Sequence, residues 1–66
     1  MELQDVKRNL NKMIVYNGER GIYRLVGCIL RKNEKGFYYT VELLDVKHGR
    51  SLLVCKLKDI EEDANV

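Results

Sequence analysis

The sequence contains no proline and no tryptophan, only one histidine and two cysteines, and no long apolar run. Without proline, the turns must depend on glycine and asparagine. No stretch approaches the ~18 apolar residues that a membrane-crossing helix needs. The first residues also lack the basic region and apolar run of a signal peptide. These absences predict a cytoplasmic protein with no membrane partner.

Length and charge further restrict the kinds of protein that this chain can be. A chain of 66 residues builds one small domain, whose core cannot also enclose a deep substrate cavity. We expect this domain at residues 1–60, followed by an acidic, frayed tail at 61–66. Residues 59–66 hold four of the ten acidic side chains and no basic one, so the remainder of the chain is basic. Such a body is compatible with a polyanionic partner, although a solvated charged surface is the commoner explanation for any single charge cluster.

Residues that carry chemistry are scarce. Cys28 and Cys55 stand in the apolar segments "VGCIL" and "LLVCKL", which predicts buried free thiols, and the sequence leaves open whether they are close enough to pair. Two cysteines and one histidine fall short of a zinc site. His48 lies beside a glycine, where an exposed turn residue is expected rather than a general base. No glycine-rich phosphate loop is present. We therefore expect no enzyme, no cofactor and no metal.

Apolar spacing predicts a helix and then strands. Leu3, Val6, Leu10 and Met13 recur at intervals of three and four, which favours an amphipathic helix at about residues 2–12. Asn-Gly at 17–18 is typical of a tight hairpin turn. Further turns are expected at "NEKG" (33–36) and "KHGR" (47–50). The segments between them predict antiparallel strands.

The strand at residues 37–46 carries apolar side chains on both faces. One face is apolar throughout and predicts the interior of a curled sheet; it holds Phe37, Tyr39, Val41 and Leu43. Alternation assigns the same interior to Tyr23, Leu25, Gly27 and Ile29 in the preceding strand, with Gly27 marking a bend, and to Leu53, Cys55 and Leu57 in the following one. The predicted fold is mainly β: a small antiparallel five-strand barrel with an N-terminal α-helix cap.

This arrangement resembles the Sm-like and Src-homology-three-like small barrels. "MIVYNGERGIYRLVGCILRK" is similar to the first strands of such a barrel, including its bent second strand, and "HGRSLLVCKLKDIEE" is similar to its closing strands. The resemblance covers nearly the whole chain but is architectural. The Sm aspartate loop is replaced here by "KNEKG", and His48-Gly49-Arg50 is only loosely similar to the second Sm signature. The residue pattern "YNG…YRL…LRKN…FYY" also resembles that of short proteins of bacterial phages and mobile elements.

Two binding functions remain. The first is a protein-interaction module, whose partner is another protein or a second copy of the chain, and which the phage resemblance connects with inhibition of a host defence complex. Its expected interface is the apolar strip of Leu44, Val46, Leu52 and Val54. The alternative is a small barrel that binds RNA or single-stranded DNA. Its expected contacts are Arg24, Arg31, Lys32, Lys35, Tyr38, Lys56 and Lys58.

Overall fold

The chain begins with a short helix. In the computed structural model, which describes residues 1–64, helix α1 spans Leu3–Asn9. It ends earlier than expected, because Leu10 is already extended and Asn11 adopts the left-handed conformation with φ 66°. Val6 is 1% exposed and joins the core, whereas Leu10 is 42% exposed and does not. The helix therefore anchors itself through one turn rather than along the expected stripe.

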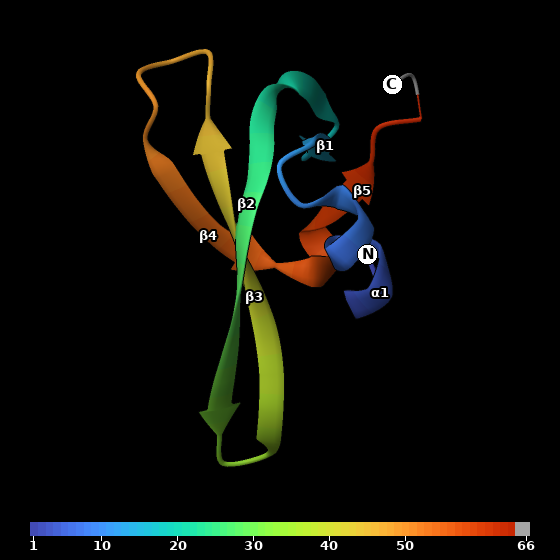
Figure 1. Cartoon of the computed structure of the whole chain (residues 1–66). Helices are drawn as coiled ribbons and strands as arrows, with labels where there is room; N and C mark the ends of the chain where they lie inside the picture. The colour runs from blue at the N-terminus through green and yellow to red at the C-terminus, as the bar shows by residue number, and fades with distance from the viewer. Residues whose placement is uncertain (65–66) are drawn as a thin grey trace.

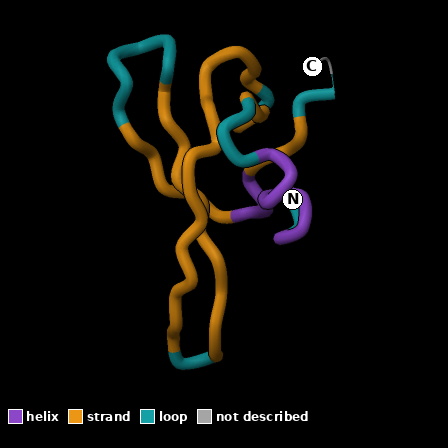
Figure 2. Tube along the Cα trace, viewed as in Figure 1, coloured by secondary structure: helices purple, strands orange, loops and turns teal. Residues whose placement is uncertain are grey.

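Within the described residues, five antiparallel strands form a single sheet, which confirms a mainly β fold with an amino-terminal helix. They are β1 (Met13–Tyr16), β2 (Glu19–Asn33), β3 (Gly36–Asp45), β4 (Leu52–Lys56) and β5 (Ile60–Glu62). Their order across the sheet is β4-β3-β2-β1-β5. A single 3-10 turn, η1 (Leu57–Asp59), connects β4 to β5. Figures 1 and 2 show the helix packed at the side where β1, β5 and η1 meet.

The sheet that residues 1–64 form is not closed, so the expected barrel is not confirmed. The strands β4 and β5 are consecutive in the chain, yet they occupy the two edges of the sheet. Of these, β4 pairs with β3 and β5 pairs with β1. The three residues of η1 carry the chain from one edge to the other without a ladder between them. The result is a strongly curved open sheet.

The turn between β1 and β2 forms as its sequence predicts. Asn17 and Gly18 have φ values of 52° and 75°, the left-handed pair that a type I′ turn requires. Asparagine and glycine are the residues that adopt this conformation most readily. This turn starts β2 in register with β1, with Tyr16 opposite Glu19.

The hydrophobic core lies on the concave face of the sheet. Six side chains there are at most 1% exposed: Val6, Ile14, Leu25, Val41, Leu43 and Ile60. They come from α1, β1, β2, β3 and β5, so each of these elements contributes to the same small core. Leu53, Cys55 and Leu57 pack against it from β4 and η1, as the alternation of that segment predicts.

A bulge at Val26 changes which residues of β2 face the core. Leu25 lies opposite Leu43, but the next pair is Gly27 with Glu42. One extra residue in β2 reverses the alternation beyond this point. The interior face therefore continues through Cys28 and Leu30. The expected placement of Gly27 and Ile29 on that face is wrong for this reason.

The expected acidic tail is partly structured. Glu61 and Glu62 belong to β5, where they lie opposite Val15 and Ile14. The guanidinium of Arg8 in α1 contacts the Glu62 carboxylate at 2.8 Å. Strand pairing and this ion pair explain why the chain does not fray directly after residue 60. Residues 65–66 of the expected tail lie outside the described part of the chain.

Candidate functional site

A two-stranded hairpin extends beyond the rest of the sheet. On one side, β4 accompanies β3 only as far as the pair of Thr40 with Lys56. On the other side, β1 accompanies β2 only as far as the pair of Met13 with Arg24. We call residues 28–39 the distal hairpin; within residues 1–64 its two strands have only each other as ladder partners. Figure 1 shows it as the long projection that ends in the turn between β2 and β3.

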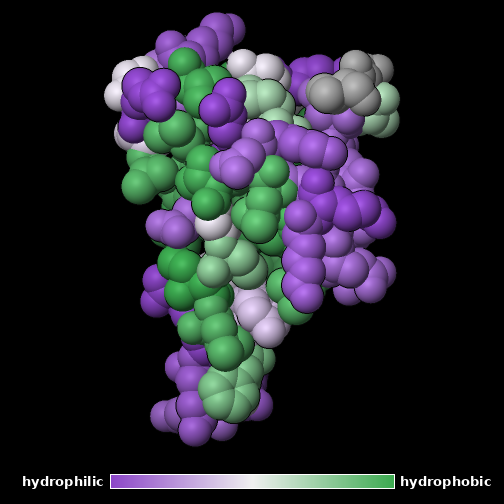
Figure 3. Space-filling view, in the orientation of Figure 1, coloured by the Kyte–Doolittle hydropathy of each residue, from purple (hydrophilic) through white to green (hydrophobic). Residues whose placement is uncertain are grey.

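The core face of the sheet continues onto the distal hairpin, where it is exposed. Leu30 is opposite Tyr39 and Lys32 is opposite Phe37, on the face that holds Val41 nearer the body. Leu30 is 56% exposed and Phe37 is 69% exposed. We call Cys28, Leu30, Phe37 and Tyr39 the hairpin stripe. In Figure 3 a band of apolar residues runs from the body of the molecule along the hairpin and ends just above its hydrophilic tip.

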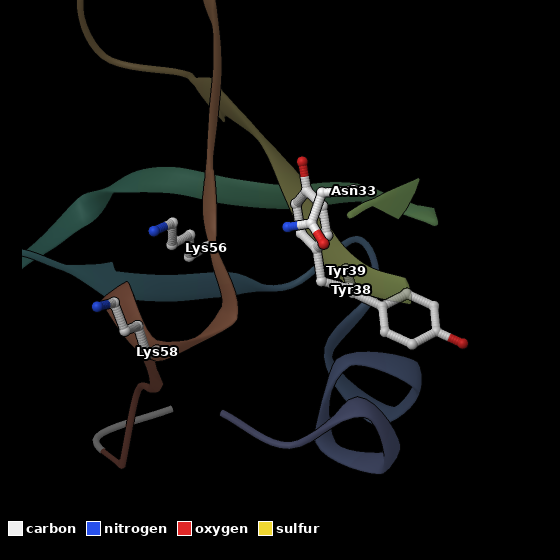
Figure 4. A pocket seen from close by; sticks show the side chains of 5 residues that line it. All are labelled: Asn33, Tyr38, Tyr39, Lys56 and Lys58. Carbon is white, nitrogen blue, oxygen red and sulfur yellow. The ribbon is translucent and has the colours of Figure 1, made fainter. Parts of the chain in front are cut away.

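A shallow hollow lies beside the open edge of β3. It has a volume of about 480 Å³ and is lined by Asn33, Tyr38, Tyr39, Lys56 and Lys58. Figure 4 shows Tyr38 and Tyr39 pointing to opposite sides of β3, while the two lysine side chains extend in the same direction. We call this the edge hollow. It unites residues from the distal hairpin with residues from the end of β4 and from η1.

The structure gathers some of the expected polyanion-binding residues and separates others. Tyr38, Lys56 and Lys58 meet at the edge hollow. Arg31 stays on the hairpin, where its Nε donates to the Thr40 hydroxyl at 3.2 Å. Three more residues lie elsewhere: Lys32 stacks over the Phe37 ring at 5.4 Å, Lys35 occupies the hairpin turn, and Arg24 sits opposite Leu44 in the body.

The expected apolar interface comes together in part. Leu52 lies opposite Leu44, and Val54 lies opposite Glu42, on the convex face of the sheet. Leu52 is 62% exposed and Val54 is 47% exposed. Val46 lies beyond the end of β3, half-buried, and its N–H donates to the Ile22 carbonyl at 2.9 Å. Leu44, Leu52 and Val54 thus form a small convex patch, and Val46 is held apart from it.

The cysteines are free and too far apart to pair. Cys28 and Cys55 both lie opposite Val41, on β2 and β4 respectively. Two strand spacings put their Cα atoms about 10 Å apart, beyond the ~7 Å limit for a disulfide. Cys28 is exposed, so its expected burial is wrong: it lies on the core face of β2, but β1 stops pairing at Arg24 and does not reach it. Desolvation raises the pKa of both thiols, which disfavours a nucleophilic role.

His48 takes part in a turn rather than in a hollow. The Asp45 carboxylate accepts the backbone N–H groups of Lys47 and His48 at 3.0 and 2.7 Å, and the imidazole Nδ1 lies 3.4 Å from the same carboxylate. The His48 side chain is 61% exposed. Among the described residues, no three histidine, cysteine, aspartate or glutamate side chains are placed to hold a metal ion.

Sequence reasoning missed Leu30, Phe37, Tyr39 and Asn33 as exposed site residues. The signal was available in the lengths of the elements. The central β2–β3 pair has strands of 15 and 10 residues, but the strands that flank it, β1 and β4, have only 4 and 5, so part of the pair must extend past them. Apolar residues in that part have no neighbouring strand to cover them.

Comparisons with protein-family models, with curated proteins and with solved structures return no match to this chain. Within residues 1–64, no helix has the length and apolar character needed to cross a lipid bilayer. Function is therefore inferred from the side chains and their geometry.

Proposed function

We propose that this chain is a non-catalytic module that binds another protein through its distal hairpin. The observation that carries the proposal is the exposed hairpin stripe, in which Leu30 and Phe37 are 56% and 69% exposed. Large apolar side chains gathered on one exposed surface are characteristic of interaction sites. Aromatic residues such as Phe37 and Tyr39 serve as anchors because they bury a large area at low entropic cost.

The hairpin itself has a physical reason to acquire a cover. An isolated two-stranded hairpin is marginally stable in water, because it lacks a second layer for its apolar face. A protein partner that packs on the hairpin stripe supplies this layer. The apolar contact of such a partner is largely insensitive to salt.

The curvature of the sheet supports a small-barrel architecture for this module. Its edge strands β4 and β5 are joined by one short turn, so the chain passes directly from one edge of the sheet to the other. The resemblance to short phage and mobile-element proteins makes a host protein, including a component of a defence complex, the class of partner to examine first. A second copy of the chain is the other protein partner to consider.

The test measures partner binding with matched variants. Proteins captured by the wild-type chain from the native host are purified and titrated calorimetrically against wild type, Phe37→Asp and Leu52→Asp. Both substitutions place a carboxylate at a similarly exposed apolar position, one on the hairpin stripe and one on the convex patch. We expect Phe37→Asp to weaken binding at least tenfold and Leu52→Asp to leave it unchanged. Equal affinity of all three proteins for every captured partner would refute the proposal.

A second candidate function is supported by the composition of the edge hollow. Two lysines and two tyrosines line it, and single-stranded nucleic acid is bound by basic grooves with aromatic side chains. On this alternative, oligothymidylate affinity falls steeply between low and physiological salt, because bound phosphates release counterions. Replacing Lys56 and Lys58 by alanine then reduces the salt slope. A flat salt response removes this candidate.

A further inference from the structure

We propose that the open edge of β3, residues 36–39, accepts an extended acidic segment of the partner as an added β-strand. This inference rests on the proposed function, since it takes the partner to be a protein. It adds the site, the mode of recognition and the charge of the segment that is recognised. The hairpin stripe and the open edge are adjacent, so one partner can occupy both.

The backbone of β3 presents unused hydrogen-bonding groups at this edge. The N–H of Asp45 donates to the Ser51 carbonyl at 2.9 Å, on the side of β4. Backbone groups alternate between the two neighbours of an antiparallel strand, so those of Phe37 and Tyr39 point to the same side. Pairing with β4 ends at Thr40 opposite Lys56, a non-hydrogen-bonded pair for which the Tyr39 carbonyl accepts from the chain just after Lys56. Among the described residues, the backbone groups of Phe37 and the N–H of Tyr39 are then left without a strand beside them. Such an edge is a template for strand addition.

The surrounding charges select an acidic segment. Lys56 and Lys58 line the edge hollow, and none of the described residues lining it is a carboxylate. Both lysine side chains extend in one direction from the chain that leaves β4, as Figure 4 shows. Acidic side chains on an added strand would lie within reach of these ammonium groups, and the charges would also speed association.

The tyrosines favour a polypeptide over a nucleic acid at this edge. Tyr38 and Tyr39 point to opposite sides of β3, so they do not form one platform on which successive bases stack. Successive side chains of an added strand also alternate between two sides. Each tyrosine can therefore contact every second residue of that strand, while the backbone groups of Phe37 and the N–H of Tyr39 bond to its main chain.

The test follows individual amides by hydrogen exchange in the full, isotope-labelled chain. The probe is a synthetic peptide of alternating glutamate and valine, added up to its solubility limit. A generic peptide suffices because main-chain bonds supply the affinity of strand addition. We expect the Phe37 and Tyr39 amides to become at least tenfold more protected. Tyr38 and Thr40, which bond to β2, should be protected with or without the peptide.

Two controls separate charge from backbone recognition. The double variant Lys56→Glu with Lys58→Glu should bind the acidic peptide at least tenfold more weakly, whereas Lys7→Glu, on an exposed position of α1, should not. A matched lysine–valine peptide should bind the wild type more weakly than the acidic one. Unchanged exchange at Phe37 and Tyr39, equal binding by the double variant, or protection of these amides by oligothymidylate instead of the peptide would each overturn the inference.

The two proposals fail separately. Suppose a purified partner binds the wild type, loses affinity for Phe37→Asp and binds the double lysine variant normally without protecting the β3 amides. The distal hairpin is then a protein-binding site that works without an added acidic strand. If neither Phe37→Asp nor the double lysine variant lowers the affinity for the partner, the proposed function itself is wrong.

Discussion

Val41 and Phe37 lie on the same face of β3, four residues apart, in opposite surroundings. Val41 is 0% exposed and Phe37 is 69% exposed. Val41 has Cys28 on one side and Cys55 on the other, whereas Phe37 has only Lys32 of β2 among residues 1–64. The same face of one strand thus passes from core to surface where its neighbours end. Burial on a sheet is decided by the adjacent strands as much as by the strand itself.

The difference divides the molecule into a body, which contains the core, and an arm, which is the distal hairpin. In the body, α1, β1, β4 and β5 surround the first part of β2 and the last part of β3, and six side chains are buried there. In the distal hairpin the same pair continues with no further layer in the described residues. Apolar residues in the body are explained by stability. Those of the hairpin stripe are not, which is why they carry the proposed binding function.

The largest expected effect is a difference in stability between two alanine variants, one in the body and one in the distal hairpin. Leu43→Ala removes a fully buried side chain and should lower the free energy of unfolding by about 2–5 kcal/mol. Phe37→Ala removes a larger side chain from an exposed position and should lower it by less than ~1 kcal/mol. Urea unfolding followed by circular dichroism measures both. Equal losses would mean that the hairpin stripe is packed in solution, and the division into body and arm would be wrong.

A smaller effect is expected at Gly27, where the body gives way to the arm. A Cβ at this position would meet the carboxylate of Glu42, its partner across the ladder. Because that carboxylate is the far end of a flexible side chain, it can move aside. We expect Gly27→Ala to destabilise the fold by about 1 kcal/mol, and the loss to disappear in a Glu42→Ala background. A double-mutant cycle by urea unfolding measures the coupling, and strict additivity would show that the two residues do not compete for space.

Local rules predicted much of the body from sequence. The Asn17-Gly18 turn formed because two residues that tolerate positive φ stand together. Alternation in β3 identified Val41 and Leu43 as interior, since no bulge interrupts that strand. The helix was placed correctly but ended early, because Asn11 favours the left-handed conformation that terminates it. Each of these outcomes depends on a few adjacent residues.

The candidate site depends on how separate segments of the chain pair with one another, which the sequence of any one segment does not contain. The bulge at Val26 inverts the alternation of β2, and no residue type at that position requires it. The exposure of Leu30 and Phe37 depends on where β1 and β4 stop pairing. The edge hollow depends on η1, which brings Lys58 to the hollow that Tyr39 also lines. Tyr38, Lys56 and Lys58 were proposed from their residue types, but their convergence followed only from the arrangement of the strands.

The smallest expected effect concerns the end of β3 opposite the arm, where Asp45 caps the turn to β4. The His48 N–H, supported by the Lys47 N–H and the charge of the His48 side chain, holds the pKa of Asp45 below its usual value. A lowered pKa in the folded state stabilises the fold above the ordinary value of about 3.9. That contribution is lost as the pH falls through the lower pKa of the folded protein. Thermal unfolding of wild type and Asp45→Asn from neutral pH to about pH 2 measures it. We expect wild type to be slightly more stable at neutral pH and the difference to vanish in acid. A difference that persists unchanged in acid would mean that the charge of Asp45 does not stabilise this turn, and that the body end of β3 is held by packing alone.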